Sequence, residues 1–468
     1  MNQFDVSYEK GLQGQRGIFL NGIDVDVTQV PVFQPTLNEG KRIYRLFDDP
    51  EHSTTLTYTI PNTNIVTSAS YLLPENKDEL EMKWDNTHLW MSQTYGLMPR
   101  LPDFLQHVLV GMYNYKDKLA SVDSMYGRNI DSYFRYCSEN NITHTHAIAD
   151  PQIDRSQTSA DDESLALSIV EKRSDGVVVR GAKQLASFSP FSHELMVYLN
   201  PGAIHNALEK NIIWFALPIG TPGLKFVCRG SYSPASNNDG SSFSRMDEQD
   251  AMVFFDDVLI PYDRIFLIGD KNVALEGYFR ANDWSIYSNL IRFLYRYKTF
   301  YYVASQCADV IGVSKYPNIA EKLGDLALFV EVIESFLKSI KESSYKTGGG
   351  LYAPGDTTAA SIFAMENSRK AASLVRDITA SGIIMQPTEG DLSCSEISGL
   401  LNKYMRGKNT DASSKAKLFR LAWDLVGSSY GMRQIIYDQW FRGPISNHKI
   451  GLHNSKFNSD EQRRFLNL

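Results

Sequence analysis

The segment ITHTHAIADPQIDRS places His144 and His146 directly before a turn at Asp150-Pro151-Gln152, in a chain that has nine histidines. Imidazole nitrogens exchange protons and hydrogen bonds near neutral pH, and the short polar side chains of a turn offer further hydrogen-bonding groups. The segment also lies where a helical sequence pattern gives way to a β pattern. We therefore expect a polar site where a helical domain meets a β domain.

A second candidate is Arg100, just ahead of the helical stretch LPDFLQHVLVGMYNYKDKLA. A cation at a helix N-terminus is unfavourable beside the positive end of the helix dipole, so a purely structural role accounts for it poorly. Arg100 is therefore a candidate functional residue.

A chain of 468 residues exceeds the usual limit of one hydrophobic core, so we expect more than one domain to position these residues. Apolar residues recur at helical spacing from about residue 80 to 137, and helical spacing returns after residue 272. Between them, short β-rich runs end at Pro, Gly and Asn turns, with a strong hairpin signal at Ser174-Asp175-Gly176. We predict domains at 1–145, 146–270 and 271–468.

Composition excludes several classes of function. The net charge of −7 and the absence of a basic segment argue against a nucleic-acid partner. The first residues have no apolar signal region, and no run approaches the length of a membrane span, so we expect a cytoplasmic protein with no membrane partner. The glycine run GGGLYAPGDTT lacks the Lys-Ser/Thr pair of a phosphate loop and is interpreted as a loop between helices.

The four cysteines are scattered without paired spacing, which favours reduced thiols over a disulfide framework or a zinc site. No metal site is therefore expected. The cysteines are Cys137, Cys228, Cys307 and Cys394.

The stretch from Thr145 to Ser156 resembles the signature of the 4-hydroxyphenylacetate 3-hydroxylase family, the oxygenase components of two-component flavin monooxygenases. Similar motifs follow in the same order: DGVVVRGAKQLAS, FDDVLIPYDRIF, LNKYMRG and LAWDLVGSSYGMR. The resemblance runs from about Gly11 to Trp440. It implies an α+β fold of the acyl-CoA dehydrogenase type, with an N-terminal helical domain, a central β-barrel domain and a C-terminal helical bundle.

The resemblance implies an FADH2-dependent monooxygenase that inserts one oxygen atom of O2 ortho to a phenolic hydroxyl through a flavin C4a-hydroperoxide. The sequence has no convincing G-x-G-x-x-G after a strand, so FADH2 is expected from a separate NAD(P)H-dependent flavin reductase. Further expectations are an aromatic small-molecule substrate and a homotetramer.

The same resemblance assigns site residues. Arg100 and His146 are implied as catalytic, and both bind substrate together with Phe104 and Asn200. His146 also belongs to the implied cofactor-binding set, whose other members are Ala147, Ile148, Gln152, Ile153, Asp154, Arg155, Ser187, Gly427, Ser428, Ser429 and Tyr430. His144 falls outside the matched positions and is interpreted as structural.

The chain departs from the family pattern at several positions. Phe104 stands where the family has Tyr, and Ser187 stands where it usually has Thr. Asn200-Pro201-Gly202 replaces small hydroxylated residues that bind a carboxylate. The substrate therefore stays open among free hydroxyphenyl compounds, carrier-tethered tyrosyl groups, chlorinated phenols and N-hydroxylation substrates. The polar loop at 230–250 is either a lid or a simple connection.

Other functions need features that are missing here. A flavin and iron–sulfur dehydratase related to this family needs several cysteine ligands, and the four cysteines do not fall in the required pattern. An acyl-CoA dehydrogenase would carry a catalytic carboxylate facing the flavin and its own family motifs. A non-catalytic flavin- or ligand-binding relative stays open, because the change to Phe104 is one that loss of activity would allow.

Overall fold

The computed structural model describes residues 4–154, 156, 166–233, 242–457 and 459–467. The chain divides into two compact units. The first contains Met1–Gly240, Arg245–Arg292 and Ser344–Pro354, and the second contains Ser241–Ser244, Phe293–Ser343 and Gly355–Leu468. The domain boundaries that the sequence predicts, at residues 145/146 and 270/271, stay a prediction.

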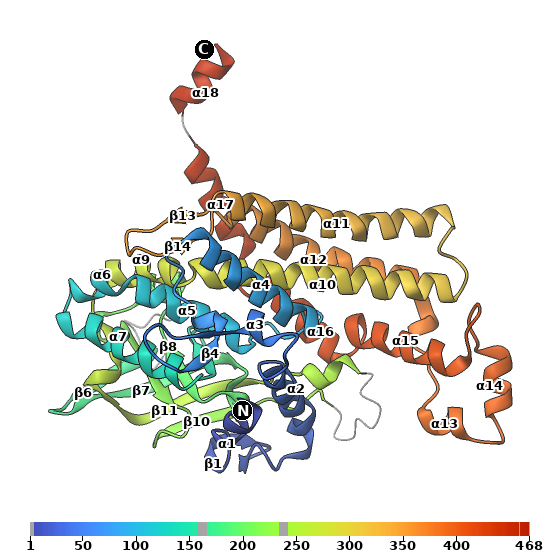
Figure 1. The fold of residues 1–468 in the computed structure, drawn as a ribbon, viewed down its shortest axis with the longest axis horizontal. Coiled ribbons are helices and arrows are strands. Elements are labelled where there is room, and N and C mark those ends of the chain that lie inside the picture. The colour runs from blue at the N-terminus through green and yellow to red at the C-terminus, as the bar shows by residue number, and fades with distance from the viewer. Residues whose placement is uncertain (1–3, 155, 157–165, 234–241, 458, 468) are drawn as a thin grey trace. The chain divides into compact units, whose positions relative to one another are not determined.

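The β part of the first unit forms two sheets (Figure 1). The six-stranded sheet has the order β2-β1-β10-β11-β7-β6, and the four-stranded sheet has the order β12-β9-β8-β5. The six strands are β1 (Gln15–Leu20), β2 (Ile23–Asp26), β6 (Ser168–Lys172), β7 (Gly176–Ser187), β10 (Leu224–Cys228) and β11 (Asp250–Pro261). The four are β5 (His144–Ala147), β8 (Glu194–Val197), β9 (Ile213–Pro218) and β12 (Ile265–Ile268).

The two sheets share a core. The rings of Phe215 on β9 and Phe255 on β11 lie 5.9 Å apart, edge to face. Both side chains are buried, as alternation along each strand requires for a face that packs on another sheet. The predicted hairpin is confirmed, since β6 and β7 pair in antiparallel fashion on either side of Ser174-Asp175-Gly176.

The first unit also contains nine complete α-helices among its described residues. They are α1 (Phe4–Lys10), α2 (Gln34–Arg45), α3 (Ser53–Leu56), α4 (Lys77–Gln93), α5 (Pro102–Asn114), α6 (Lys116–Ala120), α7 (Ser124–Glu139), α8 (Pro201–Asn206) and α9 (Lys271–Ala281). Two short strand pairs, β3 (Thr57–Thr59) with β4 (Val66–Ser68) and β13 (Tyr345–Lys346) with β14 (Tyr352–Ala353), complete the unit.

Helix α5 positions the site most directly. It begins at Pro102, whose missing N–H is unneeded in a first helical turn. Apolar residues at positions 104, 105, 108, 109 and 112 are fully buried or nearly so, as the sequence pattern predicts. Helix α9 approaches so closely at Gly111 that a Cβ there would lie 2.4 Å from the carbonyl oxygen of Ala281.

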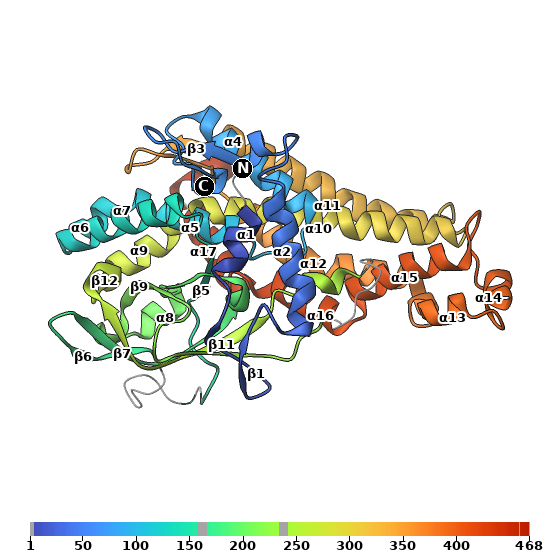
Figure 2. The same ribbon diagram turned by 60° about the horizontal axis from the view of Figure 1, so that its bottom comes forward.

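The second unit is helical. Helix α10 (Asp283–Val310) begins in the first unit and continues into the second, where α11 (Pro317–Glu342) and α12 (Thr358–Thr379) lie side by side (Figures 1 and 2). The later helices are α13 (Glu389–Ser393), α14 (Ser398–Tyr404), α15 (Ala412–Val426), α16 (Ser429–Trp440), α17 (Ile445–Lys456) and α18 (Ser459–Leu466). Arg296 and Asp438 form a buried ion pair of 3.1 Å between α10 and α16.

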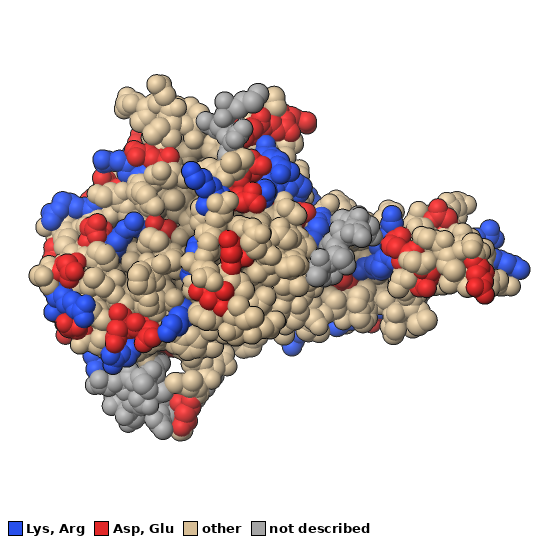
Figure 3. All heavy atoms as spheres, turned by 90° about the horizontal axis from the view of Figure 1, so that it is seen from below, with Lys and Arg blue, Asp and Glu red and all other residues tan. Residues whose placement is uncertain are grey.

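In the part of the chain that the structure describes, no helix has the length and apolarity needed to cross a membrane. Over the described residues of the face drawn in Figure 3, basic and acidic side chains are interspersed and form no continuous basic surface.

Candidate active site

His146 is positioned by the parallel pairing of β5 with β8. Its Cα lies opposite that of Met196 in this register, so its side chain shares a face with those of Met196 and, two residues further, Tyr198. The Nδ1 atom of His146 lies 2.9 Å from the hydroxyl oxygen of Tyr198. This hydrogen bond fixes the orientation of the imidazole ring.

The imidazole of His146 is neutral in this environment. The side chain is buried, and burial is the main cause that holds its pKa well below the usual value; the positive charge of Arg100 lowers the pKa further. Both causes disfavour the protonated ring. Its Nε2 atom accepts and donates no hydrogen bond within the described residues.

Arg100 and Phe104 approach His146 from the start of α5. The guanidinium carbon of Arg100 lies 4.1 Å from the centroid of the Phe104 ring, in a cation–π contact. The Phe104 and His146 rings meet edge to face, with centroids 5.9 Å apart. Three of the four side chains that the sequence assigns to substrate, those of Arg100, Phe104 and His146, are thus brought together, and all three are buried.

The backbone of Arg100 is anchored separately from its side chain. The Arg100 N–H donates to Glu248 Oε1 at 2.6 Å, and Glu248 is fully buried just before β11. The turn that aims the guanidinium is therefore held from the β side of the unit.

Residues 148–153, which follow β5, lie along β7 and the start of α8, and we call this segment the ledge. Gln184 N–H donates to the carbonyl oxygen of Ala149 at 2.9 Å, and Gln152 N–H donates to Gln184 Oε1 at 3.3 Å. Asn200 Nδ2 donates to the carbonyl oxygen of Ile148 at 3.0 Å. The ledge is thus fixed at three successive points, which keeps its backbone in place beside His146 and Ala147.

Apolar and charged groups are both displayed on this ledge. Ile153 is 50% exposed, and Leu185 on the adjoining strand is 60% exposed. Lys183, itself almost fully buried, pairs with Asp150 at 2.5 Å. An apolar surface edged by polar groups suits a planar heteroaromatic ligand.

Asn200 has a structural role in addition to the contact with substrate that the sequence predicts. Its Oδ1 accepts from Ala203 N–H at 2.9 Å, which makes it the N-cap of α8, while its Nδ2 is used by Ile148. Both ends of the amide are engaged. The side chain therefore shapes the wall of the site through these two bonds.

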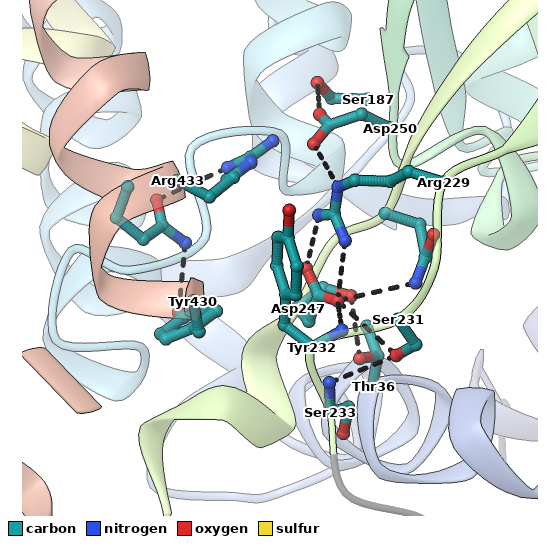
Figure 4. Close-up of polar contacts among 12 residues, drawn as sticks. Thr36, Ser187, Arg229, Ser231, Tyr232, Ser233, Asp247, Asp250, Tyr430 and Arg433 are labelled. Atoms are coloured by element: carbon teal, nitrogen blue, oxygen red, sulfur yellow. Dashed lines mark hydrogen bonds and ion pairs between the residues drawn. The ribbon is translucent and has the colours of Figure 1, made fainter. Parts of the chain in front are cut away.

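Ser187 belongs to an ion-pair network (Figure 4). Its hydroxyl donates to Asp250 at 2.5 Å, and the other oxygen of Asp250 accepts from Arg229 Nε at 2.9 Å. Arg229 also pairs at 2.6 Å with Asp247, which accepts from Tyr232 N–H at 2.8 Å. The Ser187 hydroxyl proton is thus committed to Asp250.

The four predicted cofactor residues at 427–430 lie in the second unit. Ser428 accepts from Gly431 N–H at 3.0 Å and is the N-cap of α16, which Ser429 begins. The buried Tyr430 hydroxyl accepts from Gln434 Nε2 at 3.0 Å (Figure 4). A Cβ at Gly427 would lie 2.3 Å from the Trp423 ring, so a larger residue is excluded there.

Other residues singled out in the sequence lie apart from this cluster or outside the described part of the chain. Arg155 lies outside the described residues, as do residues 234–241 of the loop that the sequence leaves open between a lid and a simple connection. Asp154 is exposed and accepts from Ser156 N–H at 2.9 Å. His144 is buried, its Nε2 lies 3.4 Å from Cys137 Sγ, and burial lowers its pKa to about 3, which agrees with a structural histidine.

Sequence reasoning missed Tyr198, Glu248 and Asp250. Tyr198 stands in a run that reads as an ordinary buried strand, and only the pairing of β5 with β8 reveals that it faces His146. Glu248 and Asp250 lie in a loop rich in Ser and Asn that offered no spacing signal. A buried tyrosine at alternating spacing after β8 was the one available hint, because a buried phenol needs a hydrogen-bond partner.

Within the described ranges, no group of three or more His, Cys, Asp or Glu side chains is placed to hold a metal ion. The chemistry that remains at the site is that of a guanidinium, a neutral imidazole and a phenol, beside an apolar ledge.

Comparison with known proteins relates this arrangement to one family. The model described as 4-hydroxyphenylacetate 3-hydroxylase N terminal matches residues 5–267, and the corresponding C-terminal model matches residues 275–465. The 4-hydroxyphenylacetate 3-monooxygenase oxygenase component of Thermus thermophilus is 30% identical over 89% of this chain and 86% of the relative. The enzyme of the same name from Geobacillus sp. is 28% identical over 93% of this chain and 90% of its own.

A solved structure agrees with the sequence relatives. The oxygenase component of 4-hydroxyphenylacetate 3-monooxygenase complexed with FAD and 4-hydroxyphenylacetate superposes with a TM-score of 0.91 at 27% identity, over 99% of this chain and 97% of that one. The expected acyl-CoA dehydrogenase-like fold is thereby confirmed in its α+β class. The predicted central β-barrel is wrong in one respect, because the described strands of the β part form two separate sheets with linear strand orders and do not close into a barrel. The chain belongs to the 4-hydroxyphenylacetate 3-hydroxylase family.

Proposed function

We propose that this protein is the oxygenase component of a two-component flavin monooxygenase and that it hydroxylates phenols at the ortho position. One observation carries the proposal: in a member of this family, the Arg100 guanidinium and the His146 imidazole converge around Phe104 in a buried cluster. Such a pair can hold a phenolic oxygen from two sides.

The residues of the first unit fit FAD as cofactor. The ledge after β5 combines the exposed apolar side chains of Ile153 and Leu185 with fixed backbone groups near Gln152, as a planar isoalloxazine with a polar edge requires. Ala147, Ile148, Asp154 and Arg155 complete the proposed contacts of this segment. Ser187, and residues 427–430 of the second unit, stay predictions as cofactor contacts. When bound, reduced FAD supplies activated oxygen from O2 for insertion into the ring.

Arg100 and His146 bind and orient the substrate ring. The guanidinium stabilises negative charge on the phenolic oxygen, which makes the ortho carbon electron-rich. His146 is neutral, so it adds a hydrogen bond to that oxygen without adding a second positive charge. Phe104 packs against both groups and keeps water away from them, which strengthens their interaction with the phenolic oxygen.

Asn200 and Pro201 line the substrate site on the side of α8 in this proposal. Because the Asn200 amide oxygen caps α8 and one of its two N–H groups bonds to Ile148, at most one N–H of the amide can reach a substrate carboxylate. The ring end of the substrate is therefore recognised more strictly than its tail. This arrangement suits a hydroxyphenyl group on tails of different kinds.

An oxygenase component works with a partner that provides reduced flavin, and we propose an NAD(P)H-dependent flavin reductase in this role. We also propose a homotetramer. An apolar stripe on α16 supports self-association: Met432, Ile436 and Trp440 recur every four residues and are 43%, 52% and 58% exposed. A stripe of this kind is typical of a helix that packs against a second subunit.

Cofactor binding tests the proposal before any turnover is measured. Anaerobic titration of the purified protein with FADH2, followed by calorimetry, is expected to give saturable binding. Ile153→Asp should weaken it about tenfold or more, or about 1.4 kcal/mol, because a charge would be placed against the apolar ring. The matched control is Val170→Asp on edge strand β6, where the side chain is 47% exposed. Equal binding by both variants would contradict the assignment of the ledge.

A further inference from the structure

We propose that Tyr198 is a positioning residue that fixes His146 as its Nε2–H tautomer, so that His146 donates a hydrogen bond to a bound phenolate. His146 then does not act as the base that removes the phenolic proton. The inference rests on the proposed function, since it names the ionised form of the phenol as the species the site recognises.

The first step concerns the two nitrogens of His146. Nδ1 lies 2.9 Å from the Tyr198 hydroxyl, and both residues are buried, Tyr198 completely. The Tyr198 ring is held between Trp214, at 6.0 Å, and Tyr278, at 6.2 Å between centroids. These ring contacts hold the hydroxyl beside Nδ1, so Nε2 is the nitrogen of His146 that is left to meet a ligand.

The second step concerns the direction of the hydrogen bond. A phenol O–H is a stronger acid than a neutral imidazole N–H, and the lone pair of Nδ1 is a better acceptor than a phenol oxygen. The Tyr198 hydroxyl therefore donates to Nδ1. A neutral imidazole carries one proton, which must then reside on Nε2.

The third step concerns charge. If His146 removed a proton from the substrate, a buried imidazolium would form beside the Arg100 guanidinium, and both burial and like charge oppose that. An Nε2–H donor and a guanidinium instead form two donors around one anionic oxygen. The phenol proton must leave for solvent before or during binding, and the charge balances as one guanidinium with one phenolate.

The tautomer can be measured without any substrate. Solid-state 15N NMR of protein labelled at histidine, with the His146 signals identified by their loss in His146→Gln, should show an unprotonated Nδ1 and a protonated Nε2. Tyr198→Phe should give a mixture of tautomers. Tyr44→Phe is the matched control, because it removes a buried hydroxyl that bonds to Thr143 at 2.5 Å and leaves the His146 pair intact.

Ligand binding gives a second readout. 4-Nitrophenol, whose anion absorbs visible light, is titrated into the flavin-free protein about one pH unit below its own pKa. The bound probe should be mainly phenolate in the wild type and in Tyr44→Phe. Tyr198→Phe should bind phenolate about tenfold more weakly, as expected for a weakened hydrogen bond to an anion.

Two results would overturn the inference: a proton on Nδ1 of wild-type His146, or a Tyr198→Phe variant that matches the wild type in both tautomer and bound phenolate. Failure of the proposed function has a different signature. In that case no phenol binds and none is hydroxylated with FADH2, while the NMR result still decides the role of Tyr198.

Discussion

At the scale of single residues, the account depends on how Arg100 is used. Its guanidinium rests on the Phe104 ring and its backbone is tied to Glu248, so the side chain is aimed by two independent contacts. Arg100→Lys keeps the charge and loses the planar stacking group and the fixed fork of donors. Comparing Arg100→Lys with Arg100→Ala therefore separates the contribution of the positive charge from that of the planar group of donors.

Arg100→Ala should reduce kcat for phenol hydroxylation about 10²-fold or more, as is typical when one preorganised donor to a reacting oxygen is removed. Arg100→Lys should reduce kcat less than Arg100→Ala does, because it keeps the positive charge. Steady-state kinetics with saturating FADH2 provides the measurement. Arg173→Ala serves as the control, because the Arg173 side chain is exposed and pairs with Glu171 at the surface. Unchanged turnover in Arg100→Ala would contradict its catalytic role.

Much of the residue-level site could be predicted because its residues lie in motifs that resemble those of the family. Arg100, Phe104 and His146 were assigned together and do lie together. Tyr198 was not assigned, because its relation to His146 is created by strand pairing across about fifty residues and has no local pattern. The direct substrate contact expected of Asn200 stays a prediction, since its amide is engaged by the backbone on both sides.

At the scale of elements, the close packing of α5 against α9 fixes the position of α5, which carries Phe104 in its first turn and directly follows Arg100 and Leu101. Helical periodicity predicted α5 correctly, since its apolar residues form one buried set. The partner helix could not be predicted, because a glycine in a helix can mark either a crossing or an exposed weak point. The structure distinguishes Gly111 from Gly324 in this respect.

Gly111→Ala should lower stability by about 1–3 kcal/mol, since its Cβ would lie 2.4 Å from the Ala281 carbonyl oxygen. Gly324→Ala, in α11, has nothing within 4 Å of the new methyl group and should stabilise the protein by about 0.5–1 kcal/mol. Urea denaturation measures both. Equal stability of Gly111→Ala and Gly324→Ala would contradict the close contact between α5 and α9.

At the scale of the whole molecule, buried histidines make stability depend on pH. Burial lowers the pKa of His107 and His146 well below the usual value, that of His193 to about 4 and that of His144 to about 3. The unfolded chain binds protons at these residues below about pH 6.5 while the folded state does not. Stability is therefore lost as pH falls below about 6.5 toward the folded pKa values.

Asp103 opposes this trend. Burial raises its pKa to about 7, so its contribution is fully present at low pH and is lost as pH rises through 7. With four histidines against one carboxyl group, the urea midpoint of the wild type should fall between pH 6.5 and 5. Asp103→Asn should steepen the fall, and His205→Gln, at an exposed position, should leave it unchanged. A midpoint that is constant over this range would contradict the burial of these groups.

Assembly is tested on the α16 stripe. Ile436→Asp should shift the protein from a tetramer toward smaller species in light scattering coupled to gel filtration, because it places a charge in the centre of the apolar surface. Leu185→Asp, which is similarly exposed but in the first unit, should leave the mass unchanged. A wild-type monomer would contradict the proposed assembly directly.

The central claim is ortho hydroxylation of a phenol with oxygen from O2. The most direct test is turnover of a panel of 4-substituted phenols with a flavin reductase, NAD(P)H, FAD and 18O2, followed by mass spectrometry of the product and assay of H2O2. The account predicts a catechol carrying one 18O atom, formed in preference to H2O2 with at least one phenol and abolished in Arg100→Ala. Consumption of all reduced flavin as H2O2 across the panel, in a protein that binds FADH2, would contradict it.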